Sequence, residues 1–216
     1  MSSEKENIME NFIMRFELDQ IDAKMCDEII EYHKNNTDYK NKGQSTLGKG
    51  DKVSVDVHVG GNTQNPIMIK YLKYITECVM IYKLKFDNSL SNLYFEEGFN
   101  IQYYPPKGGF PNWHNERSMH QTYQRALVFM TYLNDVTDGG GTDFKYQNLR
   151  VSAKKGTTLI WPTDFTHTHR SQISPTQEKY IATGWLNHCD VAQTLREEKE
   201  LYQQLETKYK ELLDKT

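Results

Sequence analysis

The hydrophobic pattern of the first fifty residues predicts a strand, a helix and a loop. Residues 11–18 read as a short strand, and apolar residues then recur at helical spacing from 21 to 30. This spacing predicts a packing helix that ends near residues 35 and 36. Residues 37–52 are polar and carry three glycines, which predicts a loop.

A second strand and a second helix follow. Residues 53–59 alternate valine with polar residues, the period-two pattern of a half-buried strand. We expect Asp56 and His58 on its solvated face, because the valines need the other one. Asn65 before Pro66 predicts a helix start, with a side-chain cap and proline at the first helical position. An apolar stripe should pack this helix against the outside of a sheet: Ile67, Tyr71, Tyr74, Ile75, Cys78 and Tyr82.

The pattern changes again after the polar loop predicted at 87–98. From residue 99 onward short strands alternate with turn-rich loops, as in an antiparallel all-β sandwich or barrel. The tail differs from both parts, because residues 191–215 are charged and carry apolar residues at a/d-like spacing. This C-terminal helix could pair with a second chain in a homodimer or pack back on its own domain, and both alternatives remain open.

Composition narrows the class of protein. A chain of 216 residues can bury one sizeable core, so we expect a single domain. The net charge of −3 gives no sign of a basic nucleic-acid-binding surface. No apolar run is long enough to span a membrane. Three scattered cysteines favour a reducing compartment, and the polar start lacks the regions of a signal peptide. We therefore expect a soluble, cytoplasmic protein.

Three side chains between residues 99 and 186 can hold one metal ion. His114 and Glu116 are two positions apart, so on an extended segment they project from the same face. A third ligand would come from His167 or His169. Two imidazoles and a carboxylate leave three positions of an octahedral ion open, the arrangement typical of non-haem Fe(II) oxygenases. A structural zinc site usually has four ligands, often thiolates, which the scattered cysteines do not provide.

The context of this motif resembles the catalytic core of the 2-oxoglutarate and Fe(II)-dependent oxygenases, in the prolyl 4-hydroxylase-like branch. The apolar strand at 125–134 ends in Tyr-Leu-Asn, as in the family. Residues 139–144, Gly-Gly-Gly-Thr-Asp-Phe, match its Gly-Gly-x-Thr-x-Phe. The likeness covers about ninety residues, and several motifs in the right order are more specific than any single one. Glu116 departs from the aspartate most common in the family, but it keeps the anionic oxygen donor.

The resemblance assigns roles to individual residues. It makes His114 and Glu116 metal ligands, together with a histidine before the last core strand. Lys179 stands where the family keeps a basic residue for the far carboxylate of 2-oxoglutarate. The resemblance also implies a co-substrate pocket lined by Tyr104, Tyr132 and Thr142.

Only the spacing along the sequence distinguishes His167 from His169 as the third ligand. On one strand both would share a face, so periodicity cannot choose between them. His169 lies ten positions before Lys179, close to the family interval, whereas His167 lies twelve before it. We favour His169 as the distal ligand. His167 remains the alternative, or else a residue that orients the metal ligand or faces the substrate.

The resemblance further implies the fold and the reaction. The expected fold is mainly β (α+β): a double-stranded β-helix, or cupin-like jelly roll, with supporting N-terminal helices and a C-terminal helix. N-terminal strands and supporting helices would occupy 1–98, the catalytic core 99–188 and the C-terminal helix 189–216. The implied activity is that of a dioxygenase hydroxylating an unactivated C–H, with Fe(II) as cofactor, 2-oxoglutarate and dioxygen as co-substrates, and ascorbate as an additional reductant. The primary substrate could be a prolyl peptide, another protein side chain or a small molecule.

Two other classes of function stay open at this point. A non-enzymatic cupin-like binding module would keep the barrel but lack a competent co-substrate site. An interaction protein would act through the C-terminal helix.

Overall fold

The structure is a computed structural model that describes residues 9–17, 20–36, 40–42, 52–86, 90 and 93–188. Two α-helices and twelve strands occur within these ranges. The helices are α1 (Gln20–Asn35) and α2 (Pro66–Lys85), and single 3-10 turns are η2 (His120–Thr122) and η3 (Phe165–His167). The strands are β1 (Met9–Glu10), β2 (Ile13–Glu17), β3 (Lys40–Lys42), β4 (Val55–Val59), β5 (Leu93–Tyr94), β6 (Phe99–Tyr104), β7 (Arg125–Tyr132), β8 (Thr142–Phe144), β9 (Leu149–Val151), β10 (Thr157–Pro162), β11 (His169–Ser171) and β12 (Lys179–His188).

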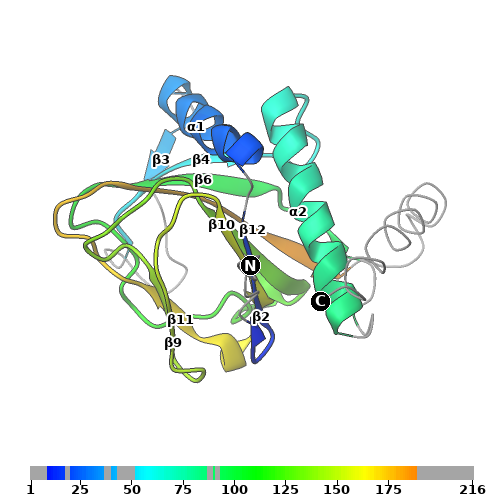
Figure 1. Ribbon diagram of the computed structural model, residues 1–216. Coiled ribbons are helices and arrows are strands. Elements are labelled where there is room, and N and C mark those ends of the chain that lie inside the picture. The colour runs from blue at the N-terminus through cyan, green and yellow to red at the C-terminus, as the bar shows by residue number, and fades with distance from the viewer. Residues whose placement is uncertain are drawn as a thin grey trace, which may run out of the picture.

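The strands form two antiparallel sheets. The major sheet runs in the order β1-β2-β10-β7-β12-β6-β4-β3, with β5 paired to the end of β12, and the minor sheet runs β11-β8-β9. Figure 1 shows both helices on one side of the major sheet and the minor sheet on the other. Strands from before residue 99 therefore belong to the same sheet as the core strands.

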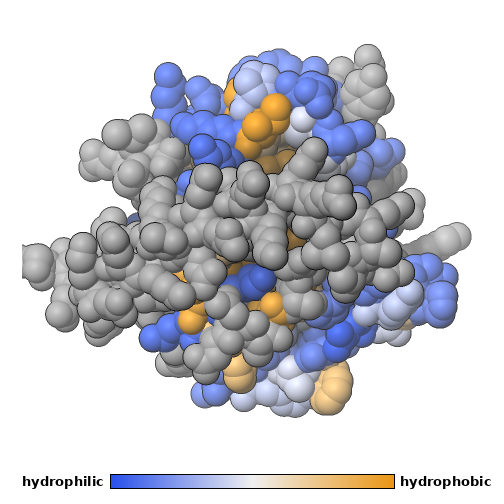
Figure 2. Space-filling model, turned by 90° about the vertical axis from the view of Figure 1, so that its right-hand side faces the viewer, coloured by the Kyte–Doolittle hydropathy of each residue, from blue (hydrophilic) through white to orange (hydrophobic). Residues whose placement is uncertain are grey.

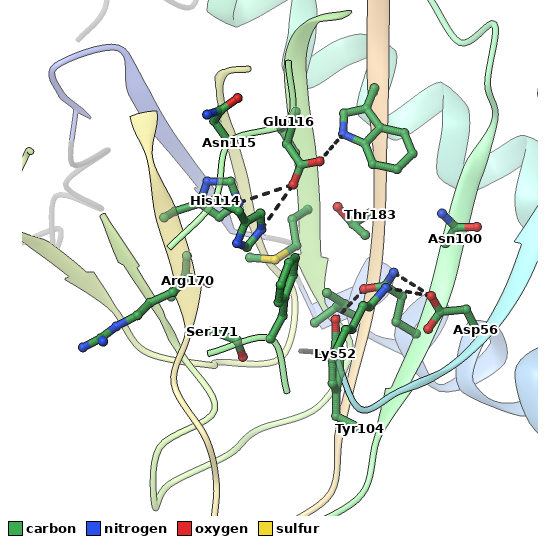
Figure 3. A pocket seen from close by; sticks show the side chains of 18 of the residues that line it. Lys52, Asp56, Asn100, Tyr104, His114, Asn115, Glu116, Arg170, Ser171 and Thr183 are labelled. Atoms are coloured by element: carbon green, nitrogen blue, oxygen red, sulfur yellow. Dashed lines mark hydrogen bonds and ion pairs between the residues drawn. The ribbon is translucent and has the colours of Figure 1, made fainter. Parts of the chain in front are cut away.

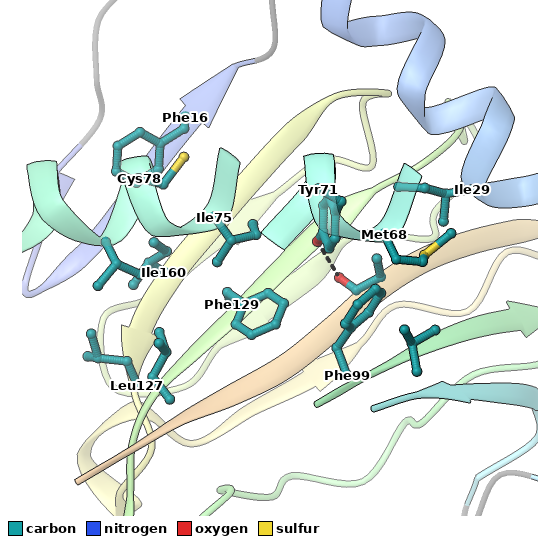
Figure 4. Close-up of a cluster of buried hydrophobic side chains, with 14 of the residues drawn as sticks. Phe16, Ile29, Met68, Tyr71, Ile75, Cys78, Phe99, Leu127, Phe129 and Ile160 are labelled. Carbon is teal, nitrogen blue, oxygen red and sulfur yellow. Dashed lines mark hydrogen bonds between the residues drawn. The ribbon is translucent and has the colours of Figure 1, made fainter. Parts of the chain in front are cut away.

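Helix α2 covers the outer face of the major sheet. Asn65 caps it, because its side-chain oxygen accepts from the main-chain nitrogens of Ile67 and Met68 at 3.0 and 3.3 Å. Figure 4 shows Tyr71 and Ile75 of this helix above Phe129 of the sheet, all three fully buried. Tyr71 also donates a hydrogen bond of 2.9 Å to the hydroxyl of Thr131, so its buried polar group is satisfied.

A second hydrophobic core lies between the two sheets. Side chains alternate along a strand, so β7 and β12 send every other residue to this inner core. Val128, Met130 and Ile181 from the major sheet meet Phe144 and Val151 from the minor one. The mainly β class with two antiparallel sheets is as the sequence predicts, and this arrangement is consistent with a double-stranded β-helix.

Sequence and structure agree on both N-terminal helices and on the strand within 11–18, but two predicted loops are partly wrong. The segment predicted as a loop at 37–52 contains β3, which pairs with β4, and the loop predicted at 87–98 contains β5. Both are very short edge pairings, of three and two residues, which is too short for hydrophobic periodicity to give a signal. The predicted helix at 191–215 lies outside the described residues.

The surface turned toward the viewer in Figure 2 is mostly hydrophilic where the described residues are visible, with a few separate hydrophobic side chains. Within the part of the chain that the structure describes, no helix is long and apolar enough to cross a membrane.

Candidate active site

His114, Glu116 and His169 meet at one end of the inner core. His114 and His169 form an isolated antiparallel bridge, in which each main-chain nitrogen donates to the other residue's carbonyl oxygen, at 3.0 and 2.9 Å. The main-chain nitrogen of Glu116 donates to the carbonyl oxygen of Thr163 at 2.9 Å, which ties this segment to the end of β10. The ligand atoms of the three side chains lie within 4.8 Å of one another, so they can hold one metal ion.

Both imidazoles have their Nε2 atoms free for a metal. Nδ1 of His114 lies 2.8 Å from the carbonyl oxygen of Asn112, and Nδ1 of His169 lies 2.9 Å from that of His167. A carbonyl only accepts, so each Nδ1 carries the proton and each neutral ring presents the Nε2 lone pair. Both Nε2 atoms face Oε1 of Glu116 at 3.5 Å. Three converging acceptors are the donor set that a divalent cation requires, so these residues fit Fe(II).

The second oxygen of Glu116 is held away from the histidines. Trp185 donates from Nε1 to Oε2 at 3.1 Å, and Nη1 of Arg125 lies 3.7 Å from the same oxygen. Figure 3 shows a carboxylate oxygen of Glu116 directed toward His114. Arg125 in turn stacks on the Trp185 ring, 3.5 Å from its centroid, and forms an ion pair with Glu97. The sequence reasoning missed Trp185 and Arg125, because no motif links them to Glu116.

Charges in this cluster favour the metal-binding forms. Burial alone would raise the pKa of Glu116, but the imidazoles of His114 and His169, when their Nε2 atoms carry a proton, hold that pKa well below its usual range, so the carboxylate is ionised before a metal replaces those protons. Burial lowers the pKa of His169, which favours its neutral ring. An anionic carboxylate and a neutral imidazole are the protonation states in which these groups bind metals.

His167 lies apart from this cluster. Its Nε2 is 2.8 Å from the carbonyl oxygen of Asn11, and its Nδ1 is 2.8 Å from the Thr166 hydroxyl. The two histidines do not share a strand, because His167 ends the 3-10 turn η3, whose start is capped by Asp164, and His169 begins β11. The main-chain carbonyl of His167, rather than its ring, accepts from His169.

A cavity of about 480 Å³ extends from the metal cluster into the barrel. Its lining includes Val128, Met130 and Ile181 of the major sheet, and Figure 3 shows Tyr104 and Ser171 farther along it. Asp56 and His58 also line it. The expected solvated face of β4 is therefore in part a cavity wall, because β4 is hydrogen-bonded to β6 and shares its inner face.

A buried lysine stands in the wall of the same cavity. Lys179 is 4% exposed, and its Nζ donates to the carbonyl oxygen of Gly140 at 3.0 Å and to the Ser171 hydroxyl at 2.5 Å. No carboxylate of a described residue pairs with it. Gly140 has a φ of +72°, and a Cβ there would lie 2.6 Å from Val136, so the glycine-rich turn can present this carbonyl only without a side chain.

Tyr104 is oriented by a polar network on the wall formed by β4 and β6. Its hydroxyl donates to Gln102 at 2.6 Å, and Gln102 donates to Asp56 at 3.0 Å. Asp56 also accepts from Lys52 at 2.8 Å and from Ser54 at 2.7 Å. The Tyr104 hydroxyl hydrogen is thus committed to Gln102, and its ring faces Lys179, with Nζ 4.6 Å from the centroid.

The other two predicted pocket residues form a buried pair. The hydroxyl oxygens of Tyr132 and Thr142 are 2.6 Å apart. Thr142 lines the cavity, whereas the fully buried Tyr132 stands behind it. Tyr132 therefore supports the position of Thr142.

The sequence of residues 99–187 matches the family model described as the 2OG-Fe(II) oxygenase superfamily. Residues 99–187 belong to the 2OG-Fe(II) oxygenase superfamily. The chain is therefore a 2-oxoglutarate-dependent dioxygenase, with Fe(II) as its cofactor and 2-oxoglutarate as its co-substrate. The resemblance seen in the sequence motifs is confirmed.

Solved structures of prolyl hydroxylases share the fold. A prolyl-4-hydroxylase from Pseudomonas putida is 15% identical with a TM-score of 0.63, and the match covers 82% of this chain and 93% of that one. The viral collagen prolyl hydroxylase of Paramecium Bursaria Chlorella virus-1, in complex with 2OG, is 17% identical with a TM-score of 0.62, over 83% and 97%. A Trichoplax adhaerens prolyl hydroxylase in complex with a hypoxia inducible factor peptide fragment is 15% identical with a TM-score of 0.66, over 82% and 84%. A sequence comparison with curated proteins found no match.

The geometry predicts different results for the two histidines. His169→Ala removes one of three converging donors, so iron should be lost, whereas His167→Ala should retain iron because its ring bonds only to Asn11 and Thr166. Iron content would be measured for both variants after anaerobic loading and desalting. An iron-free His167 variant beside an iron-replete His169 variant would reverse the assignment.

Proposed function

We propose that this dioxygenase hydroxylates an unactivated C–H of a prolyl residue in a peptide or protein. The observation that supports the dioxygenase activity is one cavity with a His-Glu-His cluster and a buried lysine that has no carboxylate partner among the described residues. A cupin-like binding module has no need to bury such a cation, because burying an ammonium without a counter-ion is costly. A dicarboxylate co-substrate supplies both a metal chelator and that counter-ion.

His114, Glu116 and His169 are the proposed iron ligands. Their main-chain and Nδ1 hydrogen bonds fix the rings before metal binds, so little reorganisation is needed. Only Oε1 of Glu116 faces the two Nε2 atoms. Glu116 therefore acts as a ligand through one oxygen, and two imidazoles with one oxygen leave room for co-substrate and dioxygen.

Lys179 is the proposed partner of the far carboxylate of 2-oxoglutarate. An ammonium opposite a carboxylate gives a charge-assisted hydrogen bond, and the low polarity of the buried site strengthens it. The hydroxyls of Ser171 and Thr142 are the neutral groups placed to assist. Tyr104 contributes its ring face and the wall position fixed by Gln102, since its hydroxyl hydrogen is already used.

Bound Fe(II), with 2-oxoglutarate and dioxygen, supplies oxidative decarboxylation of the co-substrate to succinate and CO2 and transfer of an oxygen atom to the substrate C–H. The chain's own residues hold the metal, fix the co-substrate and exclude water. Val128, Met130 and Ile181 form an apolar wall beside the cluster, which limits competing reactions with solvent.

The substrate class rests on fold similarity. All three prolyl hydroxylases described above share the fold over 82–83% of this chain, and one of them is in complex with a peptide fragment. The cavity is lined by the metal cluster and also by the polar residues Asn100 and His58. An extended peptide loop can enter such a mouth with one residue at the metal.

Turnover tests the proposal directly. The protein with Fe(II) should convert 2-oxoglutarate to succinate, faster with a proline-rich peptide, and mass spectrometry should find one added oxygen on proline. His114→Ala and Glu116→Ala should abolish succinate formation, because each removes an iron ligand. If succinate forms at the same rate without peptide and proline stays unmodified, the dioxygenase activity would be supported but the prolyl substrate would be excluded.

Trp185→Phe should weaken metal binding without emptying the pocket. The change keeps an aromatic ring on Arg125 and removes the donor to Glu116 Oε2. Loss of a hydrogen bond to a metal-binding carboxylate typically costs about 10- to 100-fold in metal affinity. Titration with Co(II) would give the dissociation constant, and its visible spectrum would report the ligand set. An unchanged affinity and spectrum would show that Trp185 does not hold the carboxylate.

Lys179 should give 2-oxoglutarate affinity a pH dependence. Burial lowers the pKa of Lys179 to about 7, so above that pH the free protein loses the ammonium. A bound carboxylate favours the charged form, so binding then takes up a proton, and affinity should fall by up to about tenfold per pH unit. Calorimetric titration with Mn(II) in the site measures both affinity and proton uptake.

Lys179→Met is the matched control for this pH effect. It keeps the length of the side chain and removes the charge, so affinity below pH 7 should drop roughly tenfold to a hundredfold. The pH dependence should disappear with the charge. If 2-oxoglutarate affinity depended on pH equally in the wild type and in Lys179→Met, Lys179 would not lie in the co-substrate site.

A further inference from the structure

An exposed group of aromatic and cationic side chains lies beside the metal cluster. We call Trp113, Lys145, Tyr146, Phe165 and Arg170 the rim patch. Trp113 is 36% exposed, Tyr146 64% and Phe165 70%, although large aromatic side chains are usually buried. Nothing in the proposed reaction uses these three rings.

Contacts join the rim patch into one surface. The Arg170 guanidinium lies 4.4 Å from the centroid of Trp113, and Lys145 Nζ lies 6.0 Å from that ring and 5.5 Å from Tyr146. The turn that carries Lys145 is hydrogen-bonded to the segment after Phe165, because its main-chain nitrogen donates to the carbonyl oxygen of Thr168 at 2.9 Å. Trp113, Lys145, Tyr146 and Arg170 thus lie together, and the segment that carries Phe165 adjoins them.

The rim patch adjoins the cavity. Trp113 directly precedes His114, and Arg170 directly follows His169. Successive residues of an extended chain point to opposite faces, so the bridge that turns both histidines inward turns Trp113 and Arg170 outward. Arg170 also lines the cavity wall, and Figure 3 shows its side chain directed away from His114 and Glu116. A chain that leaves the cavity can therefore pass over this surface.

The charge of this region is positive on a chain whose net charge is −3. Asp143 is paired with both Arg150 and Arg170. Lys145 has no carboxylate partner among the described residues. Lys145, Arg150 and Arg170 face one carboxylate, and the Arg117–Asp164 ion pair beside Phe165 adds no net charge. This side of the site therefore has a positive excess, so a partner with negative charge is electrostatically complementary.

We propose that the rim patch is a docking site for an extended acidic segment of the peptide or protein substrate, outside the residue that is hydroxylated. Exposed Trp, Tyr and Arg are the side chains that most often dominate binding energy at protein interfaces. Aromatic faces also bind extended, proline-containing segments with little loss of chain entropy. Acidic side chains of the segment pair with Lys145 and Arg170. A nucleic acid is a poorer match, because the overall charge is negative and the cations form no stripe.

The test measures binding alone, so its result is separate from that of the proposed reaction. A fluorescein-labelled peptide of alternating glutamate and proline would be titrated with the full chain, without iron or 2-oxoglutarate, by fluorescence anisotropy. Binding should be detectable, weaken as salt is raised, and fall roughly tenfold or more in Lys145→Glu. A lysine-proline peptide of the same length should not bind.

Two further variants make the test specific. Tyr146→Ser removes an exposed ring without changing charge and should weaken binding several-fold. Lys73→Glu reverses a charge on the exposed side of α2, beyond the opposite face of the major sheet, and should leave binding unchanged. Thermal melting would show that each variant is folded. The proposal would be overturned if the acidic peptide did not bind, or if Lys73→Glu weakened its binding as much as Lys145→Glu does. Tighter binding of a single-stranded oligonucleotide than of the peptide would also overturn it.

Discussion

Two main-chain hydrogen bonds between His114 and His169 are the constraint on which the site depends. The two residues are far apart in the sequence, and neither lies inside a long strand, yet the antiparallel bridge sets their rings side by side. Because the bridge is made by main-chain atoms, it does not depend on the side chains that it positions. The minor sheet supports it, since β11 continues from His169 and pairs with β8. The relative placement of the two proposed metal-binding rings is therefore set by strand pairing.

Glu116, the proposed carboxylate ligand, is longer than the aspartate most common at this place in the family. One extra methylene gives the carboxylate more freedom, and a carboxylate free to rotate could bind a metal through both oxygens. Trp185 and Arg125 restrict that freedom by occupying Oε2, and Glu97 in turn holds Arg125. The indole and the guanidinium come from β12 and β7, neighbouring strands of the major sheet. The rigid sheet thus fixes a side chain that belongs to a loop.

Sequence reasoning predicts the parts of this protein whose signals are local. The α2 helix is readable from Asn65, Pro66 and an apolar stripe, and the family motifs point to the ligand triad and to Lys179. What could not be predicted depends on contacts between distant segments. The edge strands β3 and β5 exist only because β4 and β12 offer partners. Likewise, the sequence shows Trp185 only as an aromatic residue in a strand, and its hydrogen bond to Glu116 is seen only in the folded structure.

The position of β4 has a consequence for the limits of the catalytic unit. The segment that matches the oxygenase family begins at β6, yet Lys52 and Asp56, which complete the cavity wall, precede it in the chain. A protein trimmed to the matched segment would lose that wall and the network that orients Tyr104. It would also uncover the whole hydrogen-bonding edge of β6 and the apolar face beneath α2. Unpaired edges of this kind promote association between chains, so such a fragment would be expected to aggregate before it could be assayed.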